Sequence, residues 1–211
     1  MIRLFRASLL LSVFVLTSAC TTATKLNSVD RAATRCVAVQ KTSYYPTSEN
    51  IFYYTFGQNL TGAMGGAIGA GIAHAAAGGE RQQFSAIFRN QKIDVGQIMT
   101  ERFEQQLKRS GLFAVQGNPD ANFRITILNM GAGIPNGLAI RMYPLLAVKA
   151  ELVNKSGRTI WQKTDYVAGS HDSVQPGVLE DWQANPETLR QNFVACADRL
   201  SSALIAHLGQ R

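Results

Sequence analysis

The segment DVGQIMTERFEQQLKRSGLF, at residues 94–113, contains the clearest helix signal in this chain. Its apolar residues recur at helical spacing. Asp94, followed three residues later by Gln97, matches a capping box, and Gly111 is typical of a helix C-terminus. The segment therefore predicts an amphipathic helix from Val95 to Ser110, whose apolar stripe has to be buried against another layer of structure.

Segments with strand periodicity follow this helix. Residues 121–128 (ANFRITIL) alternate apolar and polar side chains, and so do residues 146–152. Residues 154–157 (NKSG) supply a tight turn before residues 159–167, which predicts an antiparallel hairpin. Shorter strands are predicted at 35–40, 51–56 and 112–115. The aromatic-rich segment 51–56 has an alternative interpretation, as an aromatic girdle at a membrane surface.

A second helix is predicted near the C-terminus, with Asn185 as its cap and Pro186 at its first position. Because helices must cover the apolar face of a sheet, residues 34–211 predict an α+β domain. We expect a two-layer sandwich of a mostly antiparallel sheet with two main helices. The residues of the C-terminal apolar stripe are Leu189, Phe193, Cys196, Leu200, Leu204 and Leu208. With Phe103 and Leu107 of the first helix, Phe193 and Leu200 should lie between helices and sheet.

The N-terminus has the features of a bacterial export signal. Arg3 and Arg6 form a positive region, and residues 9–16 form an apolar run too short to span a bilayer as a helix. Small residues precede Cys20 as in a lipobox, so we predict a signal peptide at 1–19 and a lipid on Cys20. The position three residues before Cys20 holds Thr instead of the usual Leu, and ordinary signal cleavage is the alternative.

The residues after the cysteine indicate a location. Thr21 stands where Asp would retain a lipoprotein at the inner membrane, so bacterial sorting rules suggest an outer-membrane protein whose domain faces the periplasm. Residues 20–33 are polar and short of bulky apolar side chains, which predicts a flexible tether. The formal net charge of +7 is spread without a basic run. It indicates a solvated basic surface, with attraction to anionic lipid as the alternative.

Residues 50–79 contain no charged side chain, and the insertion at 57–79 is rich in glycine and alanine. Small residues recur there every fourth position, and on a helix they would form a flat groove that another backbone can approach closely. In water each interior glycine costs about 1 kcal/mol relative to alanine. We therefore predict a glycine-zipper-like helix that packs against membrane or partner helices, with a disordered loop as the alternative. The two tracks are Gly62, Gly66 and Ala70, and Gly65, Gly69 and Ala73.

Several local motifs resemble a known family. They are VAV at 37–39, LKRSGLF at 107–113, DANFRI at 120–125 and VKAELVNKSGRTIW at 148–161. These motifs are similar to those of small bacterial periplasmic and outer-membrane lipoproteins built on the TolB N-terminal-like domain. That group includes the curli-export channel lipoprotein and the lipoprotein activator of a penicillin-binding protein. The resemblance covers residues 35–167 without the glycine-rich insertion. It implies a shared domain fold and supplies no catalytic residue.

The sequence carries no catalytic motif. His74, His171 and His207 have no second His, Cys or carboxylate at metal-ligand spacing. We interpret His74 as a neutral packing residue, with a pH-sensitive contact as the alternative. The glycines at 65–71 lack the Lys-Ser/Thr of a phosphate-binding loop, and aromatic residues do not alternate with basic ones as in nucleic-acid binders. We expect no enzyme activity, no metal, no cofactor besides the covalent lipid, no nucleic acid and no small-molecule substrate.

Two cysteines remain besides the predicted lipidation site. In an oxidising periplasm Cys36 and Cys196 could form a disulfide that joins the first strand to the last helix. Two separate buried thiols are the alternative.

Together these features predict a non-catalytic outer-membrane lipoprotein. It would act as an envelope assembly or accessory factor that binds protein partners through its α+β domain and glycine-rich segment. The alternative is a self-associating component of an outer-membrane translocation channel.

Overall fold

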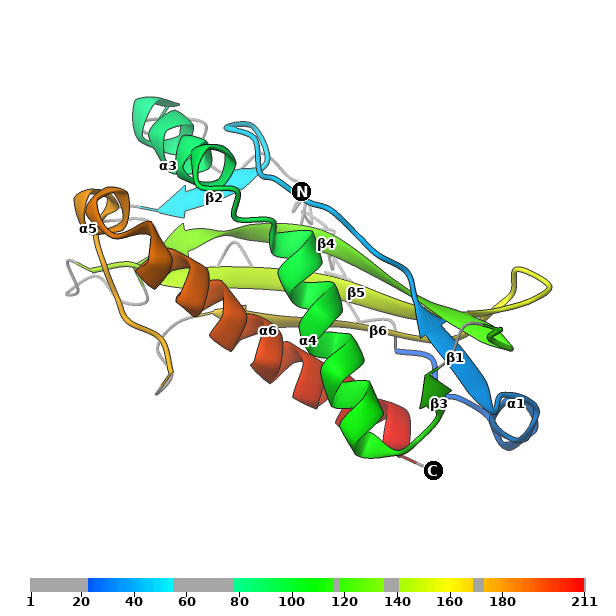
Figure 1. Cartoon of the computed structure of the whole chain (residues 1–211). Coiled ribbons are helices and arrows are strands. Elements are labelled where there is room, and N and C mark those ends of the chain that lie inside the picture. Colours follow the sequence, from blue (N-terminus) through cyan, green and yellow to red (C-terminus); the bar gives the residue numbers. More distant parts are fainter. Residues whose placement is uncertain (1–22, 55–77, 116–117, 135–140, 169–172, 211) are drawn as a thin grey trace, which may run out of the picture.

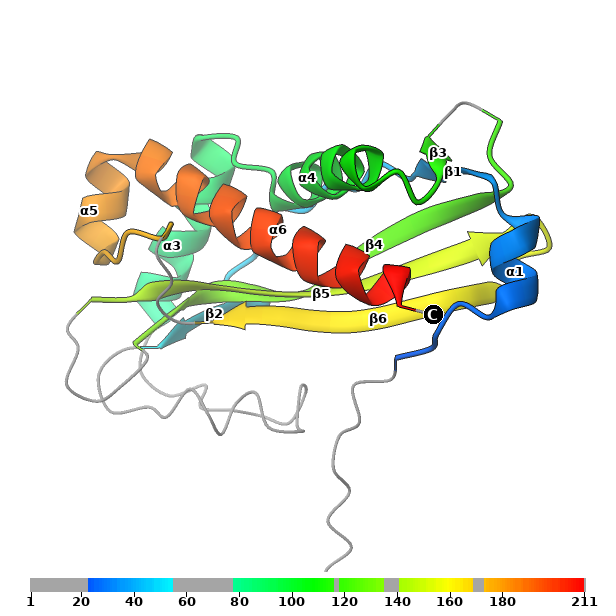
Figure 2. The same cartoon turned by 90° about the horizontal axis from the view of Figure 1, so that it is seen from below.

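A computed structural model of the chain describes residues 23–54, 78–115, 118–134, 141–168 and 173–210. In these residues a six-stranded sheet forms one layer, and the long helices lie together on one of its faces (Figure 1, Figure 2). The predicted α+β class is therefore confirmed. The apolar side chains of the sheet and the helices meet in one hydrophobic core between the two layers.

The sheet is mixed instead of mostly antiparallel. Its order is β3-β1-β4-β5-β6, and β2 pairs with β4 outside this path. The β4–β5 and β5–β6 pairs are antiparallel, whereas β1 runs parallel to β3 and β4, and β2 runs parallel to β4. The strands are β1 Cys36–Val39, β2 Ile51–Tyr54, β3 Ala114–Val115, β4 Ala121–Gly133, β5 Tyr143–Asn154 and β6 Thr159–Ala168.

Strands β1 and β2 behave as one interrupted strand along the same edge of β4. Val37–Val39 pair with Ala121–Phe123, and Ile51–Tyr54 pair with Met130–Gly133. The chain leaves the sheet between the two strands and returns in the same direction further along. The strand prediction for this aromatic-rich segment is thus confirmed as far as Tyr54, and the rest of it lies outside the described residues.

The two main helices lie where the sequence predicts them. Helix α4 spans Val95–Ser110, and the Asp94 side chain accepts a hydrogen bond from the backbone N of Gln97 at 2.9 Å. Gly111 ends the helix in the left-handed region, with φ 64°. Helix α6 spans Pro186–Gly209 and begins with proline, although Asn185 makes no side-chain capping bond. All six residues of its predicted stripe are buried.

The sequence analysis did not predict three shorter helices, which are α1 (Ser28–Ala33), α3 (Gly78–Asn90) and α5 (Leu179–Ala184). Gly78 and Gly79, assigned above to the insertion, instead begin α3. Trp182 of α5 stacks on Phe84 of α3, with ring centroids 5.4 Å apart. Both rings are fully buried, so α3 and α5 are stabilised by contacts with each other, although they lie far apart in the sequence.

The segment predicted as a flexible tether is packed onto the domain from Thr24 onward, which corrects that prediction. Thr24 exchanges two backbone hydrogen bonds with Gln162 of β6, at 2.9 and 3.3 Å. Leu26 is buried in the core. Asp30 pairs with Arg158 at 2.5 Å, and Arg31 donates to the backbone O of Leu208. We call the packed segment, residues 24–34, the N-terminal clamp.

Replacing Phe103 tests the predicted core. Phe103 is fully buried, and its ring lies 5.0 Å from that of Phe123 in β4. We expect Phe103→Ala to lower the free energy of unfolding by about 3–5 kcal/mol, because a large cavity remains between helix and sheet. Urea unfolding monitored by circular dichroism measures this. Gln105→Ala, at an exposed position of the same helix, is the control. Equal stability of the two variants would contradict the assigned core face.

Candidate interaction surfaces

The residues predicted to bind lipid or a partner lie outside the described part of the chain. They are Cys20, Gly62, Gly65, Gly66, Gly69, Ala70 and Ala73, and the same holds for His74 and His171. The structure describes the residues at which the glycine-rich segment is attached. They are Tyr54, the last residue of β2, and Gly78, the first residue of α3.

The predicted disulfide is not formed, because Cys36 and Cys196 are both free thiols in the structure. Val37 is fully buried in the core, so its neighbour Cys36 points to the opposite face of the sheet. Cys196 lies on the core side of α6. Burial raises the pKa of the Cys196 thiol to about 12, which makes it an unreactive core residue.

An aromatic cluster fixes both attachment points of the glycine-rich segment. Tyr53 of β2 lies 5.5 Å from Phe84 of α3 between ring centroids, and Phe84 lies 5.3 Å from Phe88. Burial, with the nearby charges of Glu80 and Glu180, raises the pKa of Tyr53 to about 12. The Tyr53 hydroxyl is therefore neutral near pH 7. The elements that flank the segment, β2 and α3, are thus packed together at one end of the domain (Figure 1).

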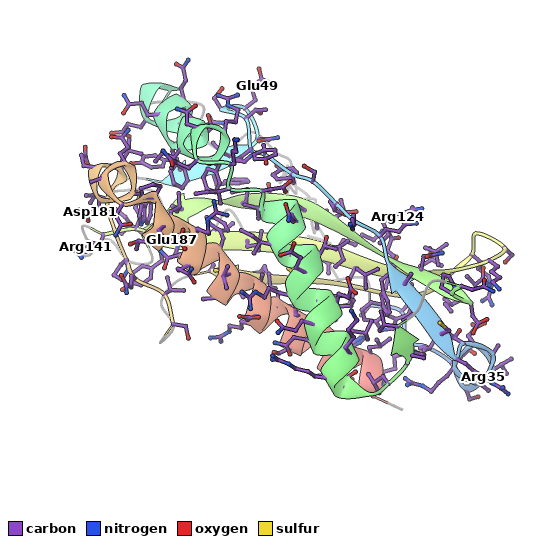
Figure 3. The ribbon with its side chains drawn as sticks, viewed as in Figure 1. Arg35, Glu49, Arg124, Arg141, Asp181 and Glu187 are labelled. Atoms are coloured by element: carbon purple, nitrogen blue, oxygen red, sulfur yellow. The ribbon has the colours of Figure 1, made fainter. Side chains whose placement is uncertain are left out.

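At the same end of the domain, further contacts join the start of β5 to α5 and to the loop before α5. Arg141 and Asp181 form an ion pair at 4.0 Å between the start of β5 and α5, and both are labelled in Figure 3. Met142 and Gly177 exchange two backbone hydrogen bonds. The indole of Trp182 lies so close to Gly177 that a Cβ there would come within 2.7 Å of Nε1. A glycine is therefore required at this position for the loop to cover the tryptophan.

The sheet face turned away from the long helices carries polar side chains over half of its length. The pairing register aligns Arg124, Glu151 and Gln162 in one row across β4, β5 and β6. Thr126, Lys149 and Thr164 form the next row. Figure 3 shows Arg124 beside β4. Lys149 and Glu151 form an ion pair at 2.8 Å. These groups offer both charges and several hydrogen-bonding atoms to a partner.

The other half of this face is apolar, but little of it is exposed. Leu145 is 2% exposed and Ala147 is 4% exposed, although both point away from the α4 and α6 layer. Tyr166, which pairs with Ala147, is 51% exposed and is the large apolar side chain that solvent reaches here. This half is therefore not a broad apolar docking surface, and the polar rows are the accessible part of the face.

His207 is the histidine that the structure describes. Trp161 donates a hydrogen bond from Nε1 to His207 Nδ1 at 3.2 Å, so Nδ1 is the acceptor and the proton of a neutral ring lies on Nε2. Partial burial lowers the pKa of His207, and the charges of Lys163 and Lys25 lower it further, against an opposing effect of Asp165. The imidazole is therefore a neutral structural group that joins α6 to β6.

No group of three or more His, Cys, Asp or Glu side chains within the described ranges could hold a metal ion. In the same ranges, no helix has both the length and the apolar character needed to cross a bilayer.

No known protein-family model and no curated protein matches the chain. Among solved structures, a Xanthomonas campestris protein of the DUF330 family superposes with a TM-score of 0.40 and 13% identity, over 53% of this chain and 59% of that one. A candidate lipoprotein of Caulobacter crescentus gives 0.35 and 14%, over 56% and 85%. A minor lipoprotein of Acinetobacter baumannii gives 0.36 and 16%, over 52% and 84%.

The likeness to these bacterial proteins is distant and concerns the fold alone. The chain spans 59% of the length of the Xanthomonas protein. The comparisons therefore assign neither a family nor a role to this chain.

The pKa of His207 makes stability depend on pH. The folded state disfavours the charged ring, and the unfolded chain binds the proton more readily, with an ordinary pKa of 6.5. The free energy of unfolding should be highest above pH 6.5 and should fall as the pH drops through the lowered pKa of the folded state. Urea titrations between about pH 8 and pH 5 measure this.

His207→Gln is the matched variant, because it keeps an acceptor for Trp161 and removes the titration. Its stability should fall less over the same pH interval. Asp30 and Asp120, whose pKa values are lowered from 3.8, titrate below this interval and do not interfere. The same pH dependence in both proteins would contradict the assignment.

Proposed function

We propose that this chain is a non-catalytic lipoprotein of the bacterial outer membrane that acts as an envelope assembly or accessory factor. The observation that carries the proposal is Cys20, which follows the small residues of an export signal and directly precedes a folded domain. Lipid on Cys20 would anchor the chain, and the α+β domain would face the periplasm.

Two features support a role in protein binding. The polar rows of the sheet face, with Arg124, Lys149 and Glu151 among them, offer a charged and hydrogen-bonding surface. The glycine-rich segment starts and ends on packed elements at Tyr54 and Gly78. Its small-residue tracks suit close approach to a helix of a partner or of a second copy of this chain.

The motifs shared with TolB N-terminal-like lipoproteins support the same view. They occupy the end of α4, the start of β4 and the β5–β6 hairpin. In each place they specify structure: a helix C-cap at Gly111, a strand entry at Asp120 and a tight turn at Gly157. We therefore propose a role that depends on shape and contacts rather than on a reaction.

Removing the acceptor cysteine tests the anchor. Cys20→Ala should convert a membrane-bound protein into one released with the periplasmic fraction, because each buried CH₂ of an acyl chain contributes about 0.8 kcal/mol to membrane binding. Fractionation after a salt wash, with intact mass of the purified protein, measures both location and lipid. Thr21→Ala is the control, since it leaves the cysteine in place. Membrane retention of Cys20→Ala would contradict lipid anchoring.

Cross-linking tests the glycine-rich segment. Single cysteines are introduced along residues 63–77 in a chain whose Cys36 and Cys196 are replaced, and cross-links are formed in intact envelopes. A helix packed on a partner gives efficient linking at every third or fourth position. Gly66→Leu and Gly69→Leu should then weaken the association while the domain keeps its stability. Links between copies within a defined ring in detergent would favour the channel. Uniform linking along the segment is the result expected of a loop.

A further inference from the structure

The N-terminal clamp fixes the place where the chain joins the domain, and this place lies at one edge of the sheet. Strand β6 is the last strand in the sheet order, and Thr24 pairs with Gln162 on its free edge. Asp30 and Arg31 bind residues of the β5–β6 hairpin and of the last turn of α6. Figure 2 shows α1 at the end of the sheet where β6 begins, with the chain before it running beside β6. The entry point is thus fixed to the domain by backbone, ionic and apolar contacts.

The chain between Cys20 and Thr24 is short. Four residues reach at most about 14 Å even when fully extended. We propose that the clamp holds the domain against the phospholipid surface, with α1 and the β6 edge turned toward the lipid. This inference rests on the proposed function, because it requires a lipid on Cys20. A flexible tether of residues 20–33 would set no such orientation.

The charges around the clamp suit a phospholipid surface that contains anionic lipid. Residues 24–34 and 154–168, which form the clamp, the hairpin turn and β6, carry five basic and two acidic side chains. The basic residues are Lys25, Arg31, Lys155, Arg158 and Lys163, and the acidic ones are Asp30 and Asp165. Asp120, which pairs with Lys155 at 3.9 Å, adds a third acidic group beside the hairpin turn and leaves an excess of two positive charges. A local excess of positive charge attracts anionic headgroups and is screened by salt.

Two exposed apolar side chains flank the same edge. Val29 of α1 is 76% exposed, and Tyr166 of β6 is 51% exposed. Tyr166 lies four residues along the strand from Gln162, which is about 13 Å at the usual rise of a strand. Tyrosine is enriched at membrane interfaces, where its ring is apolar and its hydroxyl reaches water. An edge that meets headgroups would place both side chains in a suitable environment.

The orientation is tested with the full-length lipoprotein, extracted with detergent and reconstituted into vesicles of phosphatidylethanolamine and phosphatidylglycerol. Cys36→Ser and Cys196→Ala remove the native thiols, and a fluorophore is attached at Ser28→Cys in α1, Thr164→Cys in β6 or Gln105→Cys in α4. Headgroup spin labels should quench the fluorophores in α1 and β6 and leave the one in α4 bright. Equal quenching at all three positions, or quenching at α4 alone, would overturn the proposal.

A second variant tests whether the short connection sets the orientation. Inserting twelve Gly and Ser residues between Thr22 and Ala23 adds a flexible link of about 20 Å root-mean-square length. Quenching at Thr164→Cys should be lost while the protein stays on the vesicles. Persistent quenching would overturn the proposal that the short connection sets the orientation. Intact mass separates this outcome from failure of the proposed function, since an unlipidated protein lacks the added mass and does not bind the vesicles.

Discussion

The carboxylate of Asp94 organises the first half of the domain. Its Oδ1 accepts hydrogen bonds from the backbone N of Gln97 and of Tyr44, at 2.9 and 2.8 Å, and its Oδ2 accepts one from the Ser43 hydroxyl. The same group therefore begins α4 and holds the chain that crosses from β1 to β2. Gly96 is part of this arrangement, because a Cβ there would lie 2.7 Å from the Tyr44 backbone N. Without this crossing, the two strands could not both pair with one edge of β4.

Local signals in the sequence predict the elements that this framework connects. Helix α4 is specified by its cap, its apolar spacing and Gly111, and all three act within one segment. The β5–β6 turn is likewise local, since the Asn154 side chain accepts from the backbone N of Ser156 and of Arg158, and Gly157 adopts φ 82°. In these elements, the side chains that determine the local conformation belong to the same segment that adopts it.

Elements that depend on distant partners could not be predicted in this way. The N-terminal clamp looks polar in sequence, yet its stability comes from Gln162, Arg158 and Leu208, more than one hundred residues away. Helix α3 is buried against Tyr53, Trp182 and Phe193. The alternation of apolar and polar residues in β1 and β2 does not reveal that they pair in parallel with β4, because parallel and antiparallel pairing bury the same side chains. The proposed lipid and partner sites rest on Cys20 and the glycine tracks, which lie outside the described residues and remain predictions.

The clamp and the glycine-rich segment are attached at opposite ends of the domain. The clamp packs beside the β5–β6 hairpin turn, whereas β2 and α3 pair and pack at the far end of β4 (Figure 1). If Cys20 carries a lipid, as proposed above, a four-residue connection would limit rotation of the domain, and the clamp would set the position of β2 and α3 relative to the membrane. A partner that binds the glycine-rich segment would then have to reach it at a defined distance from the lipid. Under the proposed lipid anchor at Cys20, the clamp would thus constrain how partners can approach the domain.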